Sequence, residues 1–225
     1  MTALLPRLAD GGTVVCLASG PSLTTEDVNY VRGKAVVIAI NDAISLAPWA
    51  DVVYSSDQIW WSRHYRQLRT FHGIRVRVHA SNCRSTRGKV RPGRCEGCQR
   101  AKPASGTCWC DGIVTFHNAG DTGISFEPDM ICTTQNSGGA AINVAVHLGA
   151  KRVGLLGYDM GPDRLGRRHF YDDRAQTITS PFVKFRKFIA TMVEPLKAAG
   201  VEVVNCSRQT ALECFPCRPI EEWLC

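Results

Sequence analysis

Five cysteines lie within residues 83–110, and their spacing is suited to binding a metal ion. Cys95 and Cys98 are separated by two residues, which lets two thiolates turn onto one zinc ion. Four ligands complete a tetrahedral site, so four of these five suffice: Cys83, Cys95, Cys98, Cys108 and Cys110. We therefore predict a structural zinc site here, with unligated or disulfide-linked thiols as the alternative.

The same stretch is strongly basic and has almost no aliphatic side chains. Glu96 is its only acidic residue, so positive charge dominates residues 83–110. Because it cannot bury a core of its own, we expect the metal to order it. The excess positive charge favours an anionic acceptor, nucleic acid included, and a solvated basic loop is the alternative.

The last part of the chain carries four more cysteines: Cys206, Cys214, Cys217 and Cys225. Cys214 and Cys217 have the two-residue spacing of a zinc knuckle, but no clear second pair accompanies them. A second metal site at these residues is a further hypothesis.

Polar residues follow several apolar segments, at the points where we expect strands to end. Gly20, Pro21 and Ser22 come after the first segment, and Gly20 permits a close backbone approach. A capped helix start follows, whose free N–H groups could cradle a phosphate. Asn41 and Asp42 come after the next segment and could read a ribose or a base. The absence of Gly-x-Gly-x-x-Gly excludes the standard dinucleotide fingerprint.

A helix and a core strand later in the chain should contribute to the same crevice. Asn136 or Ser137 is a good N-cap, apolar residues then recur at helical spacing, and Gly149 supplies the stop. The apolar run 153–157 follows and ends in Tyr158 and Asp159. Ligands of open α/β sheets bind outside the carboxyl ends of strands, so we expect the helix start and these two residues to face one crevice.

The remaining elements alternate in the manner of a parallel α/β fold. Further strands are predicted at 13–18, 35–40, 52–54, 73–78, 112–116 and 201–205, and further helices at 59–68 and 182–199. We therefore predict one Rossmann-like domain over residues 1–225, with a mostly parallel sheet flanked by helices and residues 83–110 as a cysteine-rich insertion.

Composition supports a folded protein with a full core. The chain has 225 residues, 44% hydrophobic and 21% charged, and a formal net charge of +7. Its apolar runs are too short to span a membrane, and its start lacks a signal-peptide pattern. We therefore expect a cytoplasmic protein without a membrane span, and the positive charge favours an anionic ligand or partner. The oligomeric state is not predicted.

Taken together, these motifs resemble a known superfamily. A strand before Gly20-Pro-Ser-Leu, a strand before Asn41, Ser137-Gly before a helix, Leu155-Leu-Gly-Tyr-Asp, and Val201-Glu-Val-Val-Asn-Cys-Ser are its marks. The pattern is similar to that of bacterial sialyltransferases of glycosyltransferase family 42, hydroxymethylpterin diphosphokinase-like proteins and flagellin-glycosylating Maf proteins. Many bacteriophage-encoded proteins of unassigned substrate share it. The resemblance covers most of the chain outside residues 83–110.

The resemblance implies a nucleotide site with named contacts. Gly20, Pro21 and Ser22 would lie against the phosphate or sugar, and Asn41 would contact the nucleotide. Ser137 and Gly138 match the Ser-Gly at the start of the second helix. Asp159 matches the aspartate that ends the fourth strand.

The resemblance also implies a histidine general base and lid tyrosines after the fourth strand. His169 and Tyr171 are the candidates, in a polar loop that could close over a donor. Histidine suits the role because its ordinary pKa lies near neutral pH. The local sequence differs from that of the sialyltransferases, so sialic acid is not specifically predicted.

The predicted function is therefore nucleotide-dependent group transfer. The preferred hypothesis is a glycosyltransferase that uses a nucleotide-sugar donor. One alternative is a hydroxymethylpterin-type diphosphokinase that uses ATP and Mg²⁺, for which Asp42, Asp57 and Asp159 are candidate ligands. The other is a non-catalytic nucleic-acid-binding module that uses the basic insertion.

Overall fold

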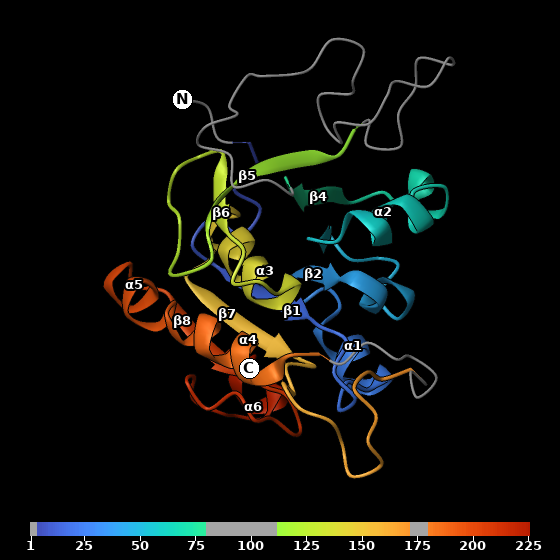
Figure 1. The fold of residues 1–225 in the computed structure, drawn as a ribbon, viewed down its shortest axis with the longest axis vertical. Helices are drawn as coiled ribbons and strands as arrows, with labels where there is room; N and C mark the ends of the chain where they lie inside the picture. The colour runs from blue at the N-terminus through green and yellow to red at the C-terminus, as the bar shows by residue number, and fades with distance from the viewer. Residues whose placement is uncertain (1–3, 80–111, 172–179) are drawn as a thin grey trace.

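The computed structural model of the protein describes residues 4–79, 112–171 and 180–225 (Figure 1). These residues form an eight-stranded sheet with the order β6-β5-β4-β3-β2-β1-β7-β8, in which all neighbours are parallel. The strands are β1 (Thr13–Leu17), β2 (Val36–Ile40), β3 (Val52–Ser55), β4 (Ile74–Val78), β5 (Val114–Gly120), β6 (Met130–Cys132), β7 (Arg152–Leu156) and β8 (Glu202–Asn205). The prediction of a Rossmann-like α/β fold is thus confirmed.

Helices cover both faces of this sheet. They are α1 (Thr25–Val31), α2 (Gln58–His64), α3 (Ser137–His147), α4 (Phe182–Ala190), α5 (Val193–Ala198) and α6 (Ile220–Trp223), with 3-10 turns η1 (Asn41–Ser45) and η2 (Gln67–Thr70). Figure 1 shows α3, α4 and α5 in front of the sheet. No helix in the described ranges is long and apolar enough to cross a membrane.

The apolar strands create two cores because successive side chains point to opposite faces. In β1, Val14 and Cys16 pack on the face covered by α3, whereas Val15 and Leu17 pack on the face covered by α1. All four side chains are fully buried. Continuous apolar runs such as that of β1 are what a parallel sheet covered on both faces requires.

The central strand β1 marks the point where the chain changes direction across the sheet. From β1 the strands proceed through β2 to β6 on one side, and β7 and β8 then pair on the other side. The loops after β1 and β7 therefore diverge at the carboxyl edge, which is where ligands of such sheets bind.

Several predicted boundaries were wrong. Strand β6 was not predicted, and the helix expected at 182–199 is divided into α4 and α5. Pro195 lies in the first turn of α5 and has no N–H to donate back to the preceding turn, which accounts for the break. The helix expected at 59–68 ends at His64 and is followed by η2.

The two cysteine predictions have different outcomes. All five candidate zinc ligands of residues 83–110 lie outside the described residues, so that site stays a prediction. Within the described ranges, no three His, Cys, Asp or Glu side chains gather as metal ligands. Cys206 is buried, whereas Cys217 and Cys225 are exposed, and no group of three ligands among the described residues includes them, so the second metal site stays a hypothesis.

Candidate functional site

A small pocket of about 100 Å³ lies at the carboxyl ends of β1 and β2, beside the start of α3. Its walls come from the loop after β1, the first residue of η1, the first turn of α3, the loop after β7 and the start of α4. The structure brings together these sequence-predicted residues in its lining: Gly20, Asn41, Ser137, Gly138 and His169. Pro21, Ser22, Asp42, Tyr158, Asp159 and Tyr171 do not line it.

Two glycines allow the ends of β1 and β7 to touch behind this pocket. The Gly20 amide donates a hydrogen bond of 2.9 Å to the Gly157 carbonyl oxygen. A Cβ on Gly20 would collide with that carbonyl and with the Asp159 carboxylate. Gly157 has a φ of +71°, and a Cβ there would lie 2.6 Å from the Ala18 carbonyl oxygen. Larger residues would force the two loops apart.

The buried Asp159 side chain connects these two loops by hydrogen bonds. Its carboxylate is 4% exposed and accepts hydrogen bonds of 2.9 Å from both the amide and the hydroxyl of Ser22. Burial raises the pKa of Asp159 to about 6, and the bonds from Ser22 oppose that rise. Asp159 therefore fixes the loop that carries Gly20.

Tyr158 has a similar bracing role. Its side chain is fully buried, and its hydroxyl donates a hydrogen bond of 2.9 Å to the Gly138 carbonyl oxygen. Burial raises its pKa well above the ordinary value. The sequence placed Tyr158 and Asp159 at the correct edge of the sheet, but both side chains point into the protein. They position α3 and the β1 loop.

The amides predicted to bind phosphate at the start of α1 are partly occupied. Thr24 and Asp27 form a capping box, in which the Thr24 hydroxyl accepts from the Asp27 amide and the Asp27 carboxylate accepts from the Thr24 amide. The Ser22 amide is bound to Asp159, and Pro21 has no N–H. The other two first-turn amides of α1 find no acceptor among the described residues, so phosphate binding at this helix stays a prediction.

Free donors also occur at the start of α3, an eleven-residue helix whose first residues line the pocket. The Asn136 side chain caps the Gly139 amide at 3.1 Å, and the Ser137 hydroxyl accepts from the Ser56 amide at 3.1 Å. The amides of Ser137 and Gly138 find no acceptor in the described part of the chain. Unsatisfied first-turn amides and the positive end of the helix dipole together attract an anion.

Asn41, which also lines the pocket, carries a second unsatisfied group. It has a φ of +52°, a conformation that asparagine tolerates better than most residues. Its Oδ1 is buried and has no hydrogen-bond partner among the described residues. Leaving a buried acceptor unpaired costs about 1–3 kcal/mol, which a ligand donor would recover.

Asp42 is turned away from the pocket and organises its outer wall. Its carboxylate accepts from Trp60 Nε1 at 2.9 Å and from the Tyr171 hydroxyl at 3.0 Å. His64 Nε2 lies 3.6 Å from the same carboxylate, and the His64 ring stacks on Trp60. This cluster of aromatic partners was not foreseen from the sequence, in which Trp60 and His64 appear only as helical residues.

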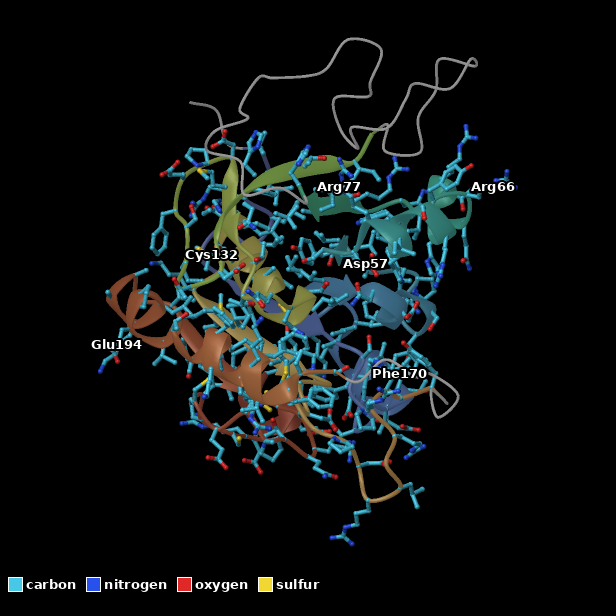
Figure 2. All side chains as sticks on the ribbon, in the orientation of Figure 1. Asp57, Arg66, Arg77, Cys132, Phe170 and Glu194 are labelled. Atoms are coloured by element: carbon cyan, nitrogen blue, oxygen red, sulfur yellow. The ribbon has the colours of Figure 1, made fainter. Side chains whose placement is uncertain are left out.

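The loop after β7 carries the candidate base to the pocket. The Phe170 amide donates to the Ser19 carbonyl oxygen at 3.0 Å, and the Phe170 side chain packs against the α1 face of the sheet (Figure 2). The rings of His169 and Tyr171 stack with centroids 5.0 Å apart and planes 9° apart. Arg168 also lines the pocket and was not predicted. His169 is thus held between the pocket and the Asp42 cluster.

The remaining candidate ligand for Mg²⁺, Asp57, caps a helix. It lies just before α2, where Figure 2 labels it, and its carboxylate accepts from the Ile59 amide at 2.7 Å. Each of the three candidate carboxylates therefore accepts hydrogen bonds within the described structure: Asp42, Asp57 and Asp159. They do not form a common group of metal ligands among the described residues.

Comparison with known proteins gives no family assignment. No protein-family model, curated protein or solved structure matches the chain.

Proposed function

We propose that this protein is a group transferase that uses a nucleotide donor, with a nucleotide sugar as the donor and His169 as the general base. The observation that carries the proposal is one pocket that combines the open amides of α3, the unpaired Oδ1 of Asn41 and the ring of His169. The sequence resemblance to nucleotide-dependent glycosyltransferases points to the same chemistry.

The pocket would receive the phosphate part of the donor. At about 100 Å³ it is smaller than the roughly 300–1,000 Å³ typical of sites that enclose a drug-sized ligand. The amides of Ser137 and Gly138 would bind phosphate oxygens, and Arg168 adds positive charge to the wall. Asn41 would accept a hydrogen bond from a hydroxyl or amino group of the nucleoside.

In the proposed reaction, His169 accepts the proton of an acceptor hydroxyl. The acceptor oxygen forms a bond to the transferred sugar carbon as the bond from that carbon to the donor phosphate oxygen breaks. The electron pair leaves on the phosphate oxygen, where the α3 amides stabilise the developing charge. Tyr171 keeps the His169 ring in place by stacking, and its hydroxyl is anchored on Asp42.

The described carboxylates favour this function over the diphosphokinase alternative. Transfer from ATP relies on carboxylates that hold Mg²⁺ against the phosphates. The carboxylates of Asp42 and Asp159 instead accept hydrogen bonds from Tyr171 and Ser22, and neither residue lines the pocket.

The zinc site in residues 83–110 is a part of the proposal that rests on cysteine spacing. Elemental analysis should find about one zinc ion per chain, and replacing Cys95 and Cys98 with Ser should remove it. Folded protein without metal would contradict the zinc assignment. Salt-sensitive binding of DNA or RNA would support a nucleic-acid acceptor at the basic stretch.

The transferase proposal is tested by measuring melting temperature and donor turnover with a panel of nucleotides. A nucleotide sugar, or the nucleoside phosphate it releases, should raise the melting temperature most, because a ligand at 100 times its Kd adds about 2.7 kcal/mol. Slow release of the nucleotide from the same donor should follow. Turnover of ATP alone would favour the diphosphokinase, and binding of no nucleotide would end the proposal.

A further inference from the structure

A second and larger hollow lies beside α4, next to the candidate donor pocket. It measures about 610 Å³, within the range of sites that hold small organic molecules. One wall is Gly161 and Pro162 from the loop after β7, and the other is the first two turns of α4. Ser180 and Phe182 line both this hollow and the smaller pocket, so the two spaces adjoin.

Among the described residues that line the hollow, the charged side chains are all cationic: Lys184, Arg186 and Lys187. Arg186 is anchored, because its guanidinium donates a hydrogen bond of 2.9 Å to the Met160 carbonyl oxygen. Across residues 4–79, 112–171 and 180–225, none of the three forms an ion pair with a carboxylate. Their positive charge is therefore not neutralised by the described structure.

Apolar side chains stand next to these charges. Phe182 and Val183 line the hollow together with two prolines, and Val183 is 58% exposed. An exposed apolar surface edged by unneutralised cations complements an organic anion better than a neutral sugar or a bare inorganic ion.

We propose that this hollow is the acceptor site, and that the acceptor is an organic molecule carrying a phosphate or carboxylate group. The inference rests on the proposed transferase function. It gives the two substrates separate anion sites, with the donor phosphate at α3 and the acceptor charge at α4. His169 lines the smaller pocket, which shares Ser180 and Phe182 with this hollow.

Lysine labelling tests the charge preference without any turnover. Pyridoxal 5′-phosphate forms an imine with a lysine amine by loss of water, and borohydride reduces that imine to a stable secondary amine. Mass spectrometry should show Lys184 and Lys187 labelled about three- to tenfold more than Lys197, which is exposed on α5. Pyridoxal lacks the phosphate and should show no such preference, and added salt should weaken the preference for the phosphate ester. Equal ratios for the two reagents would overturn the proposal.

Kinetics then tests the role in transfer with the donor that the nucleotide panel identifies. The variant Lys184→Gln/Lys187→Gln should raise the KM for an anionic acceptor about three- to thirtyfold. The matched control Lys197→Gln/Arg218→Gln removes the same charge from other exposed positions and should leave that KM unchanged. An unchanged KM in both variants, or preference for neutral acceptors, would refute the inference.

The two proposals fail in distinguishable ways. Donor turnover together with unselective labelling would refute the acceptor site and leave the transferase function standing. Selective labelling without turnover of any donor would refute the transferase function and retain the hollow as an anion site.

Discussion

Two groups of polar residues at the carboxyl edge of the sheet look alike in sequence, but they differ in how far their hydrogen bonds are satisfied within the protein. On the β1–β7 side, Ser22 and Asp159 bind each other, and Gly20 contacts Gly157. On the side formed by Asn41 and the start of α3, a buried oxygen and two amides have no partner within the described residues. Both sides present short polar residues after apolar runs.

The difference shows which polar residues are free to bind a ligand. Groups that satisfy one another contribute stability and position the loops, because their hydrogen-bonding capacity is already used. Groups left unsatisfied cost stability and recover it when a ligand binds. We call the β1–β7 side the frame, because its residues hold the loops of the pocket in place. We call the side formed by Asn41 and the start of α3 the open side, because its groups would contact a ligand.

The largest expected effect is on catalysis, at His169 in the loop after β7. Replacing His169 with Ala should lower kcat by about 10²- to 10⁴-fold, because the acceptor proton then lacks a base. Nucleotide binding should change little. The control is His72→Ala, which removes an exposed histidine that does not line the pocket. Equal turnover by the His169 variant and the wild type would remove His169 from the mechanism.

The second prediction concerns the pH dependence of stability on the framed side. The pKa of Asp159 is raised to about 6, so the folded state holds its proton more tightly than the unfolded state does. The contribution of Asp159 to stability is therefore greatest below about pH 4, and it falls by about 3 kcal/mol as pH rises through 6.

Urea denaturation of the wild type and of Asp159→Asn at several pH values measures this contribution. Asparagine keeps the shape and does not titrate, and the Ser22 hydroxyl can rotate to donate to its oxygen or accept from its amide. The difference in unfolding free energy between the two proteins should change by about 2 kcal/mol between pH 4 and pH 7. A difference that is constant with pH would show that Asp159 is not buried as described.

A third prediction tests the close contact of the two loops. Gly20→Ala should reduce the free energy of unfolding by about 1–3 kcal/mol, because the new methyl group meets the Gly157 carbonyl and the Asp159 carboxylate. Gly161→Ala is the matched control, since its methyl group would find no atom closer than 3.8 Å. Calorimetry that finds the same stability for both variants would argue against the contact.

The smallest effects should separate the two sides most directly. Asn41→Gly suits the positive φ and removes the unpaired oxygen, so stability should change by less than about 1 kcal/mol while nucleotide binding weakens about three- to tenfold. Ser22→Ala should do the reverse, with a loss of about 1–3 kcal/mol in stability and unchanged binding. If both variants lost binding equally, the division into frame and open side would be wrong.

The sequence predicted most of the sheet because several strands, such as β2 and β3, are largely apolar runs bounded by glycine or polar residues, whereas β4 alternates arginine with aliphatic residues. Strand β6 escaped notice because it has three residues, too few to establish a pattern. The division of the helix at 182–199 could have been anticipated from Pro195, which cannot donate to the preceding turn.

The site was less predictable, because sequence places polar residues at an edge and does not say which of them pair. Thr24 and Asp27 have the spacing of a capping box, and that signal could have shown that the start of α1 was already capped. The pairing of Ser22 with Asp159 joins residues far apart in the chain, and no local pattern reveals it. The same holds for Asp42, whose partners come from α2 and from the loop after β7.

The parallel pairing of β4 with β5 bears on how the protein could be re-engineered. Val76 pairs with Val114 and Val78 with Phe116, so the chain leaves the carboxyl end of β4 and must return to the amino end of β5. Such a return needs roughly a dozen residues, and the entropic cost of a longer connection rises only slowly with its length. The requirement set by the described strands is therefore a connection of at least about a dozen residues between β4 and β5, and a replacement segment of that length could still join them.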